Sequence, residues 1–80
     1  MHELSLAMSL IELAEAETAK SGNSRIVSVK VIVGQQSGVD PDAFCFMLDL
    51  AKKNTMLENA AINLDIVDGG ELRVVSMEVE

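Results

Sequence analysis

The residues of this sequence best suited to bind a metal are the first two, Met1 and His2, and His2 is the only histidine among 80 residues. A terminal amine, the backbone amide nitrogen of His2 and its imidazole can close adjacent chelate rings around one cation. Backbone amides give up their proton to few metals under mild conditions. Ni(II) and Cu(II), which favour tetragonal sites of nitrogen and oxygen donors, are the usual ones. These residues alone leave a plain alternative open, in which a solvated terminal histidine binds nothing.

The composition is typical of one small globular domain. Hydrophobic residues make up 49% of the chain and charged residues 24%, which predicts a folded chain with a single core. The net charge of -7 argues against nucleic acid and anionic membranes as partners, because both require a cationic protein surface. Cys45 is the only cysteine, so this chain can form neither an internal disulfide nor a thiolate zinc cluster. Without a signal peptide or a long apolar run, we expect a cytoplasmic protein.

The first half of the chain predicts a helix followed by a strand. Apolar residues recur at helical spacing over residues 3–20, which indicates an amphipathic helix. Alternation at a period of two over residues 25–34 indicates a strand, with its valines in the core and Ile26 and Ile32 on the opposite face. The stripe of the helix is formed by Leu6, Leu10, Leu13 and Ala14, widened by Ala7 and Ile11.

The second half predicts one helix and two strands. Asp40 followed by Pro41 is typical of a helix start, and the apolar stripe that follows extends the helix over residues 41–53. Alternating apolar residues predict strands over 61–67 and 71–79. Between these strands, Asp68-Gly69-Gly70 is a tight-turn signal that predicts a hairpin of the last two strands. The apolar residues of the last strand change phase, which indicates a bulge or burial on both faces.

These elements combine into a single domain over residues 1–80 with an α/β fold of the two-layer α+β type. The element order is helix, strand, helix, strand, strand. Two strands separated by a helix are expected to lie parallel, so the three-stranded sheet is mixed. Each helix has one apolar stripe and the sheet has one clearly apolar face, so we expect both helices to pack on that face.

Three segments of the chain resemble the HypA/HybF family of hydrogenase and urease nickel-insertion accessory proteins. They are residues 1–6 (MHELSL), 34–41 (GQQSGVDP) and 72–80 (LRVVSMEVE). The resemblance implies that Met1, His2 and Glu3 form the nickel-binding motif. It also relates Asp40 to the acidic position before the second helix of the family.

The sequence departs from the family pattern at two places. Family members carry a zinc module with paired CxxC motifs between the last two strands, whereas this chain has only residues 68–70 there. We therefore expect no zinc in this chain, and any contact that the module makes in relatives is in doubt. Family sequences also tend to have Glu where this chain has Gln35, so a charge at that position is lost.

The resulting functional hypothesis is a metallochaperone, and not an enzyme, because one His and one Cys cannot supply a nucleophile, a base and an orienting group. Met1 and His2 would give three nitrogen donors to Ni(II), and Glu3 or Asp40 a fourth donor. A helix cap is the simpler explanation of Asp40. The resemblance implies delivery of nickel to [NiFe]-hydrogenase or urease, with the accessory GTPase of nickel insertion and the hydrogenase large subunit as partners. The alternative is a metal-free module for protein–protein interaction or homodimerisation, through a sheet edge or the Ile26/Ile32 face.

Overall fold

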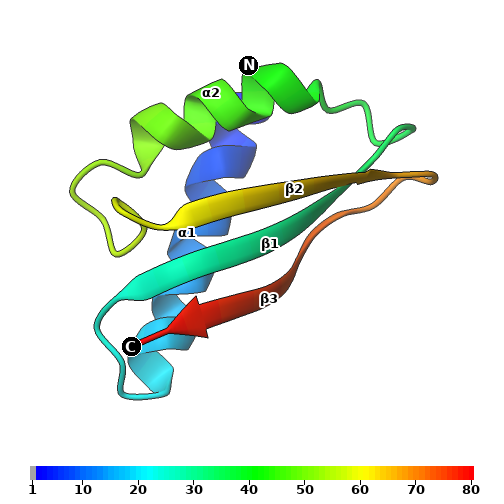
Figure 1. The fold of residues 1–80 in the computed structure, drawn as a ribbon. Coiled ribbons are helices and arrows are strands. Elements are labelled where there is room, and N and C mark those ends of the chain that lie inside the picture. The colour runs from blue at the N-terminus through cyan, green and yellow to red at the C-terminus, as the bar shows by residue number, and fades with distance from the viewer. Residues whose placement is uncertain (1) are drawn as a thin grey trace.

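The structure, a computed structural model, describes residues 2–80. It contains, in chain order, α1 (His2–Lys20), β1 (Ile26–Gly34), α2 (Pro41–Ala51), β2 (Ala61–Val67) and β3 (Leu72–Val79) (Figure 1). The expected fold class and element order are confirmed, and each element lies within two residues of its expected bounds. No helix within residues 2–80 is long and apolar enough to span a membrane.

The sheet has β1 at its centre, in the order β2-β1-β3. β1 pairs in parallel with β2, as expected for a crossover through a helix, and antiparallel with β3. The expected hairpin between the last two strands is therefore wrong, because β2 and β3 lie on opposite sides of β1. Residues 68–70 reverse the chain direction, but only Gly69 of the two glycines has a positive φ, at 102°, whereas the tightest hairpin turn of type I′ requires two.

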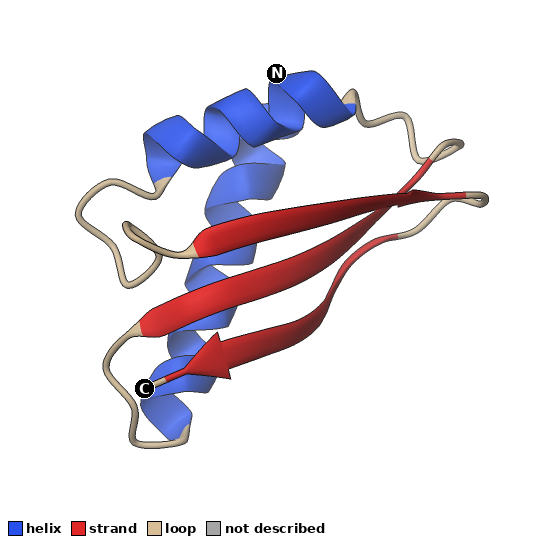
Figure 2. Ribbon diagram, viewed as in Figure 1, coloured by secondary structure: helices blue, strands red, loops and turns tan. Residues whose placement is uncertain are grey.

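Both helices pack on one face of the sheet and share a single core with it (Figure 2). α1 crosses behind the strands and α2 lies beside the β2 edge (Figure 1). Burial of apolar side chains from both layers supplies the main driving force for a domain of this size. The largest fully buried apolar side chains come from β1, α2 and the loop before β2: Phe44, Ile26, Leu48, Leu57, Val29, Val31 and Val33.

The buried face of α1 is rotated relative to the expected stripe. Leu13, expected in the core, is 56% exposed, whereas Thr18 is 1% exposed and donates its hydroxyl hydrogen bond to the carbonyl oxygen of Ala14. The rotation arises because α1 packs against α2 as well as the sheet, which displaces the buried face towards the residues that meet both. That face consists of Ala7, Leu10, Ile11, Ala14 and Thr18.

Two irregularities in strand pairing decide which side chains face the helices. The pairing of β1 with β3 shifts between Ile26 and Ser28, so Ile26 turns into the core and Val27 becomes the unpaired residue. The expected Ile26/Ile32 face therefore does not exist. A second shift leaves Val75 of β3 unpaired and exposed, which confirms the expected bulge.

Gly34, at the end of β1, lies directly under the connection between β2 and β3. Its N–H donates to the carbonyl oxygen of Glu71 at 2.6 Å. A Cβ at this position would lie 2.9 Å from the Glu71 nitrogen and 2.7 Å from the carbonyl carbon of Gly69. Only glycine allows the backbone of the connection to approach β1 this closely.

Replacing Gly34 with Ala is expected to lower the free energy of unfolding by about 1–3 kcal/mol, because the backbone of the connection must move away from β1. Gly70→Ala is the matched control. Gly70 does not have a positive φ, and its nearest neighbour would lie 4.0 Å from an added Cβ. Urea denaturation followed by circular dichroism measures both variants, and equal midpoints for the two would contradict the close approach.

Candidate metal-binding site

The candidate site lies where the first turns of the two helices meet. His2 and Glu3 form the start of α1, and Asp40 is the residue immediately before α2. The backbone N–H of Asp40 donates to the carboxylate Oε2 of Glu3 at 3.4 Å. The structure thus brings together two of the four predicted ligand residues, which are 37 residues apart in the sequence.

Asp40 caps α2. Its carboxylate Oδ1 accepts hydrogen bonds from the backbone N–H groups of Asp42 at 3.0 Å and Ala43 at 3.4 Å, and Pro41 occupies the first helical position. The N-cap predicted from Asp-Pro is therefore present, and it satisfies N–H groups that have no acceptor within the helix. Both of these hydrogen bonds are accepted by the same oxygen, Oδ1. Capping the helix and binding a metal are therefore compatible roles for the Asp40 carboxylate.

His2 is exposed in the first turn of α1. Met1, whose amine is a predicted donor, lies outside the described residues. Within residues 2–80, no cluster of three or more His, Cys, Asp or Glu side chains is arranged to hold a metal ion. The side chains of this region therefore do not form a complete site by themselves, and nitrogen donors from the backbone would have to complete it.

The acidic residues at the starts of α1 and α2 also have a structural role, because their charges interact with the helix dipoles. The N-terminal ends of α1 and α2 each carry the positive end of a helix dipole, which an acidic side chain in the first turn stabilises. Glu3 and Asp42 are such first-turn residues, and Asp40 is the cap. The same negative charges would offset the repulsion between a bound cation and the helix dipoles.

One residue close to this region, Gln36, has no signal in the sequence. Gln36, in the loop between β1 and α2, accepts a hydrogen bond through its side-chain Oε1 from the N–H of Gly69 at 2.6 Å. Its own N–H donates to the carbonyl oxygen of Gly69 at 2.8 Å. No pattern in the sequence pairs a polar loop residue with a turn 33 positions away.

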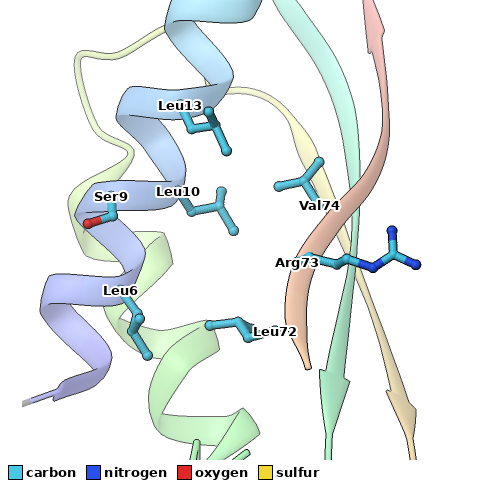
Figure 3. A pocket seen from close by; sticks show the side chains of 7 residues that line it. All are labelled: Leu6, Ser9, Leu10, Leu13, Leu72, Arg73 and Val74. Atoms are coloured by element: carbon cyan, nitrogen blue, oxygen red, sulfur yellow. The ribbon is translucent and has the colours of Figure 1, made fainter. Parts of the chain in front are cut away.

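A second surface feature is an apolar groove of about 170 Å³ between α1 and β3 (Figure 3). In Figure 3 the side chain of Arg73 points away from the groove, and its guanidinium pairs with Glu71 at 3.0 Å. The groove therefore has no metal-binding character, and it is separate from the region around Glu3 and Asp40. Leucine and valine side chains dominate its lining, which consists of Leu6, Ser9, Leu10, Leu13, Leu72, Arg73 and Val74.

Comparison with known protein families identifies the chain. Residues 1–70 match the family model described as "Hydrogenase/urease nickel incorporation, metallochaperone, hypA". The chain belongs to the HypA family. The resemblance to this family is thereby confirmed, over a match that includes the first two of the three segments (residues 1–6 and 34–41). The family is described as one of metallochaperones, which agrees with the expectation that the chain is not an enzyme.

Relatives and solved structures agree with this assignment. A hydrogenase maturation factor HypA from Roseiflexus sp. is 45% identical over 67 residues, which are 84% of this chain and 54% of the relative. A factor of the same name from Aeromonas hydrophila is 38% identical over 63 residues, covering 79% of this chain and 56% of the relative. This member of the HypA family thus spans little more than half the length of these curated relatives.

The fold is also shared with a solved structure. The solution structure of the Ni metallochaperone HypA from Helicobacter pylori superposes with a TM-score of 0.82 at 23% sequence identity. The match covers 99% of this chain and 97% of that chain. At 23% identity, the structural similarity establishes the fold. It does not assign the ligand residues of this HypA-family chain.

Replacing Asp40 with Ala is expected to lower the free energy of unfolding by about 1 kcal/mol, because α2 loses its cap. Asn retains an oxygen that can accept from the same N–H groups, so Asp40→Asn should stay within a few tenths of a kcal/mol of the unsubstituted chain. Urea denaturation of both variants tests this, and equal destabilisation by Ala and Asn would mean that the negative charge, and not the cap, stabilises the helix.

Proposed function

We propose that this chain is the nickel-binding module of a metallochaperone, with Ni(II) as cargo bound at its N-terminus. The amine of Met1, the amide nitrogen and the imidazole of His2 are the nitrogen donors, and Glu3 or Asp40 supplies a fourth donor. The observation that carries the proposal is the hydrogen bond between the Asp40 N–H and the Glu3 carboxylate. It supports the proposal because Glu3 directly follows His2 in the chain, and the bond joins the backbone of a second acidic residue, Asp40, to the Glu3 carboxylate.

The position of His2 at the start of α1 suits an amide that must lose its proton. The first N–H groups of a helix have no acceptor within the helix, so deprotonating the His2 amide breaks no helical hydrogen bond. The resulting anionic nitrogen and the neighbouring carboxylates offset the unfavourable helix dipole. Nitrogen and carboxylate donors in a tetragonal arrangement are a set that Ni(II) accepts.

The donor set also suits a protein that passes its metal on. His2 is exposed, and the first two residues leave at least one coordination position for another ligand. Membership of a hydrogenase and urease nickel-incorporation family supports maturation of [NiFe]-hydrogenase as the process served, with urease as the other nickel enzyme. We propose the accessory GTPase of nickel insertion and the hydrogenase large subunit as partners.

The alternative is a metal-free module that binds another protein. The groove between α1 and β3 favours it, because Leu13 is exposed at one wall and apolar side chains of β3 form the other. The unpaired edge of β3 lies next to this groove, although the bulge at Val75 interrupts it, and bulges of this kind reduce pairing with further strands. This alternative predicts that binding of a partner does not depend on His2.

A nickel titration of the chain with a free Met1 amine is expected to give one bound Ni(II) per chain. His2→Ala removes the imidazole, and two residues added before Met1 remove the amine, so each variant should lose at least about tenfold in affinity. Calorimetry gives the affinity and stoichiometry, and absorbance in the visible region reports bonding of Ni(II) to a deprotonated amide.

The same titration tests whether the carboxylate of Asp40 is a nickel ligand. Asp40→Asn keeps an acceptor for the cap but removes the charge, so weaker binding in this variant would indicate a ligand. Asp42→Asn, in the same helical turn, is the matched control for charge. Nickel affinity that is unchanged in both His2→Ala and the extended chain would exclude the N-terminal site.

Nickel binding is also expected to weaken on acidification, because protons compete for the imidazole and the amine and must replace the metal at the amide. Below neutral pH each proton that is displaced on binding contributes up to a tenfold loss of apparent affinity for each pH unit. Titrations at a series of pH values measure this slope. An affinity that does not change with pH would mean that the donors are carboxylates alone.

A further inference from the structure

Two loops meet at the end of the sheet next to the candidate site. One is the loop of residues 35–40 between β1 and α2, and the other is the connection of residues 68–71 between β2 and β3. They are joined by two reciprocal hydrogen bonds, from the Gln36 N–H to the Gly69 carbonyl oxygen at 2.8 Å and from the Gly69 N–H to Gln36 Oε1 at 2.6 Å. We refer to this pair of bonds as the Gln36–Gly69 clasp.

Of the two bonds of the clasp, only the one that Gln36 Oε1 accepts depends on a side chain, whereas the bond from the Gln36 N–H is formed by the backbone. The other bonds are formed by the backbone alone, from the Gly34 N–H to the Glu71 carbonyl oxygen at 2.6 Å and from the Gln35 N–H to the Val67 carbonyl oxygen at 2.8 Å. Gly69 forms the tip of the connection with a φ of 102°. Its N–H is satisfied by the Gln36 side chain, which therefore contributes one of the two bonds that hold the tip.

The short segment between the clasp and Asp40 is held by its own hydrogen bonds. The Ser37 N–H donates to the Gly34 carbonyl oxygen at 3.0 Å, and the Val39 N–H donates to the Ser37 hydroxyl at 3.2 Å. After Asp40, the cap and the fixed φ of Pro41 anchor the chain to α2. Because these bonds restrain the segment on both sides of Gly38, we expect a displacement of residue 36 to be transmitted to Asp40.

We propose that Gln36 is a positioning residue for the site, whose side-chain oxygen fixes the loop of residues 35–40 so that the Asp40 N–H meets the Glu3 carboxylate. The geometric part of this proposal concerns the metal-free protein. Its consequence for nickel rests on the proposed function, because it assumes that Glu3 or Asp40 is a ligand. The side-chain oxygen accepts the hydrogen bond. A carboxylate at position 36 should therefore hold the loop in the same place, whereas an apolar side chain should not.

The test uses three variants at positions 35 and 36 of the full chain, with Glu3→Ala as the reference for loss of the Glu3 carboxylate. Gln36→Met keeps the length of the side chain but removes the acceptor, whereas Gln36→Glu keeps an acceptor. Gln35→Met is the matched control, because the side chain of Gln35 forms no hydrogen bond within residues 2–80 while its backbone bond is kept. Amide resonances and hydrogen exchange of Gly69 and Asp40 are measured by NMR without metal, in moderate salt, followed by nickel titration.

In Gln36→Met, the Gly69 amide is expected to exchange about fivefold faster, as loss of one hydrogen bond implies. The Asp40 amide resonance should move towards its position in Glu3→Ala, which lacks the acceptor carboxylate. Nickel affinity should fall about threefold or more, because displacing Asp40 weakens its hydrogen bond to the charged Glu3 carboxylate and so costs part of the free energy of that bond. Gln36→Glu and Gln35→Met should keep both the unsubstituted Asp40 resonance and the unsubstituted affinity.

The outcomes separate this proposal from the proposed function. An Asp40 resonance that stays in place in Gln36→Met, while Gly69 exchanges faster, overturns the positioning role. A loss in Gln36→Glu equal to that in Gln36→Met also overturns it, because the acceptor would then be irrelevant. If the unsubstituted chain binds no nickel, the proposed function fails, whereas the Asp40 resonance still decides whether Gln36 positions the loop. If Gln36→Met does not fold, Gln36→Ala, which also removes the acceptor, is measured in its place.

Discussion

The pairing of β1 on both of its edges is the constraint on which the rest of the structure depends. Neighbouring strands are about 4.8 Å apart, so β2 and β3 are separated by about 10 Å with β1 between them. The four residues that join them can span about 14 Å at most, and they must therefore cross directly over the end of β1. Gly34 makes this crossing possible because a Cβ would collide with the backbone above it. The crossing in turn presses the connection against the loop that leads to α2, so the topology of the sheet determines where Asp40 is held.

A second consequence follows from packing both helices on the same face of the sheet. The start of α1 then lies beside the start of α2, and the contact between Glu3 and Asp40 results. Two positive dipole ends in one place are unfavourable without negative charge. The acidic residues therefore stabilise the metal-free fold, and the oxygen donors of the proposed site come from the same residues. A site of this kind needs no side chain that is buried at a cost to stability, because each carboxylate already has a structural partner.

Periodicity in the sequence was sufficient for the elements and the two layers, since burial on one face of each element is what creates the pattern. It was insufficient for strand order. Asp68-Gly69-Gly70 encodes a reversal of the chain, and the local residues do not determine whether the returning strand pairs with its predecessor or with the strand beyond it. Strict alternation also placed Ile26 on the wrong face, because a one-residue shift in pairing reverses every side chain before it. The Asp40 cap is local and was predicted, whereas the Gln36–Gly69 clasp depends on two loops meeting in space.

The proposed nickel site thus has two parts of different origin. Its nitrogen donors belong to Met1 and His2 and exist as a chelate only where Met1 carries a free amine. Its oxygen donors are placed by the fold, through the crossing over Gly34, the loop that follows and the cap of α2. Changes to the terminus should therefore remove metal binding without affecting stability, whereas changes in the crossing should affect both. This separation means that a stably folded variant without nickel affinity has lost a donor group, either at the terminus or at a carboxylate, whereas a variant that loses both properties points to the backbone that holds Asp40.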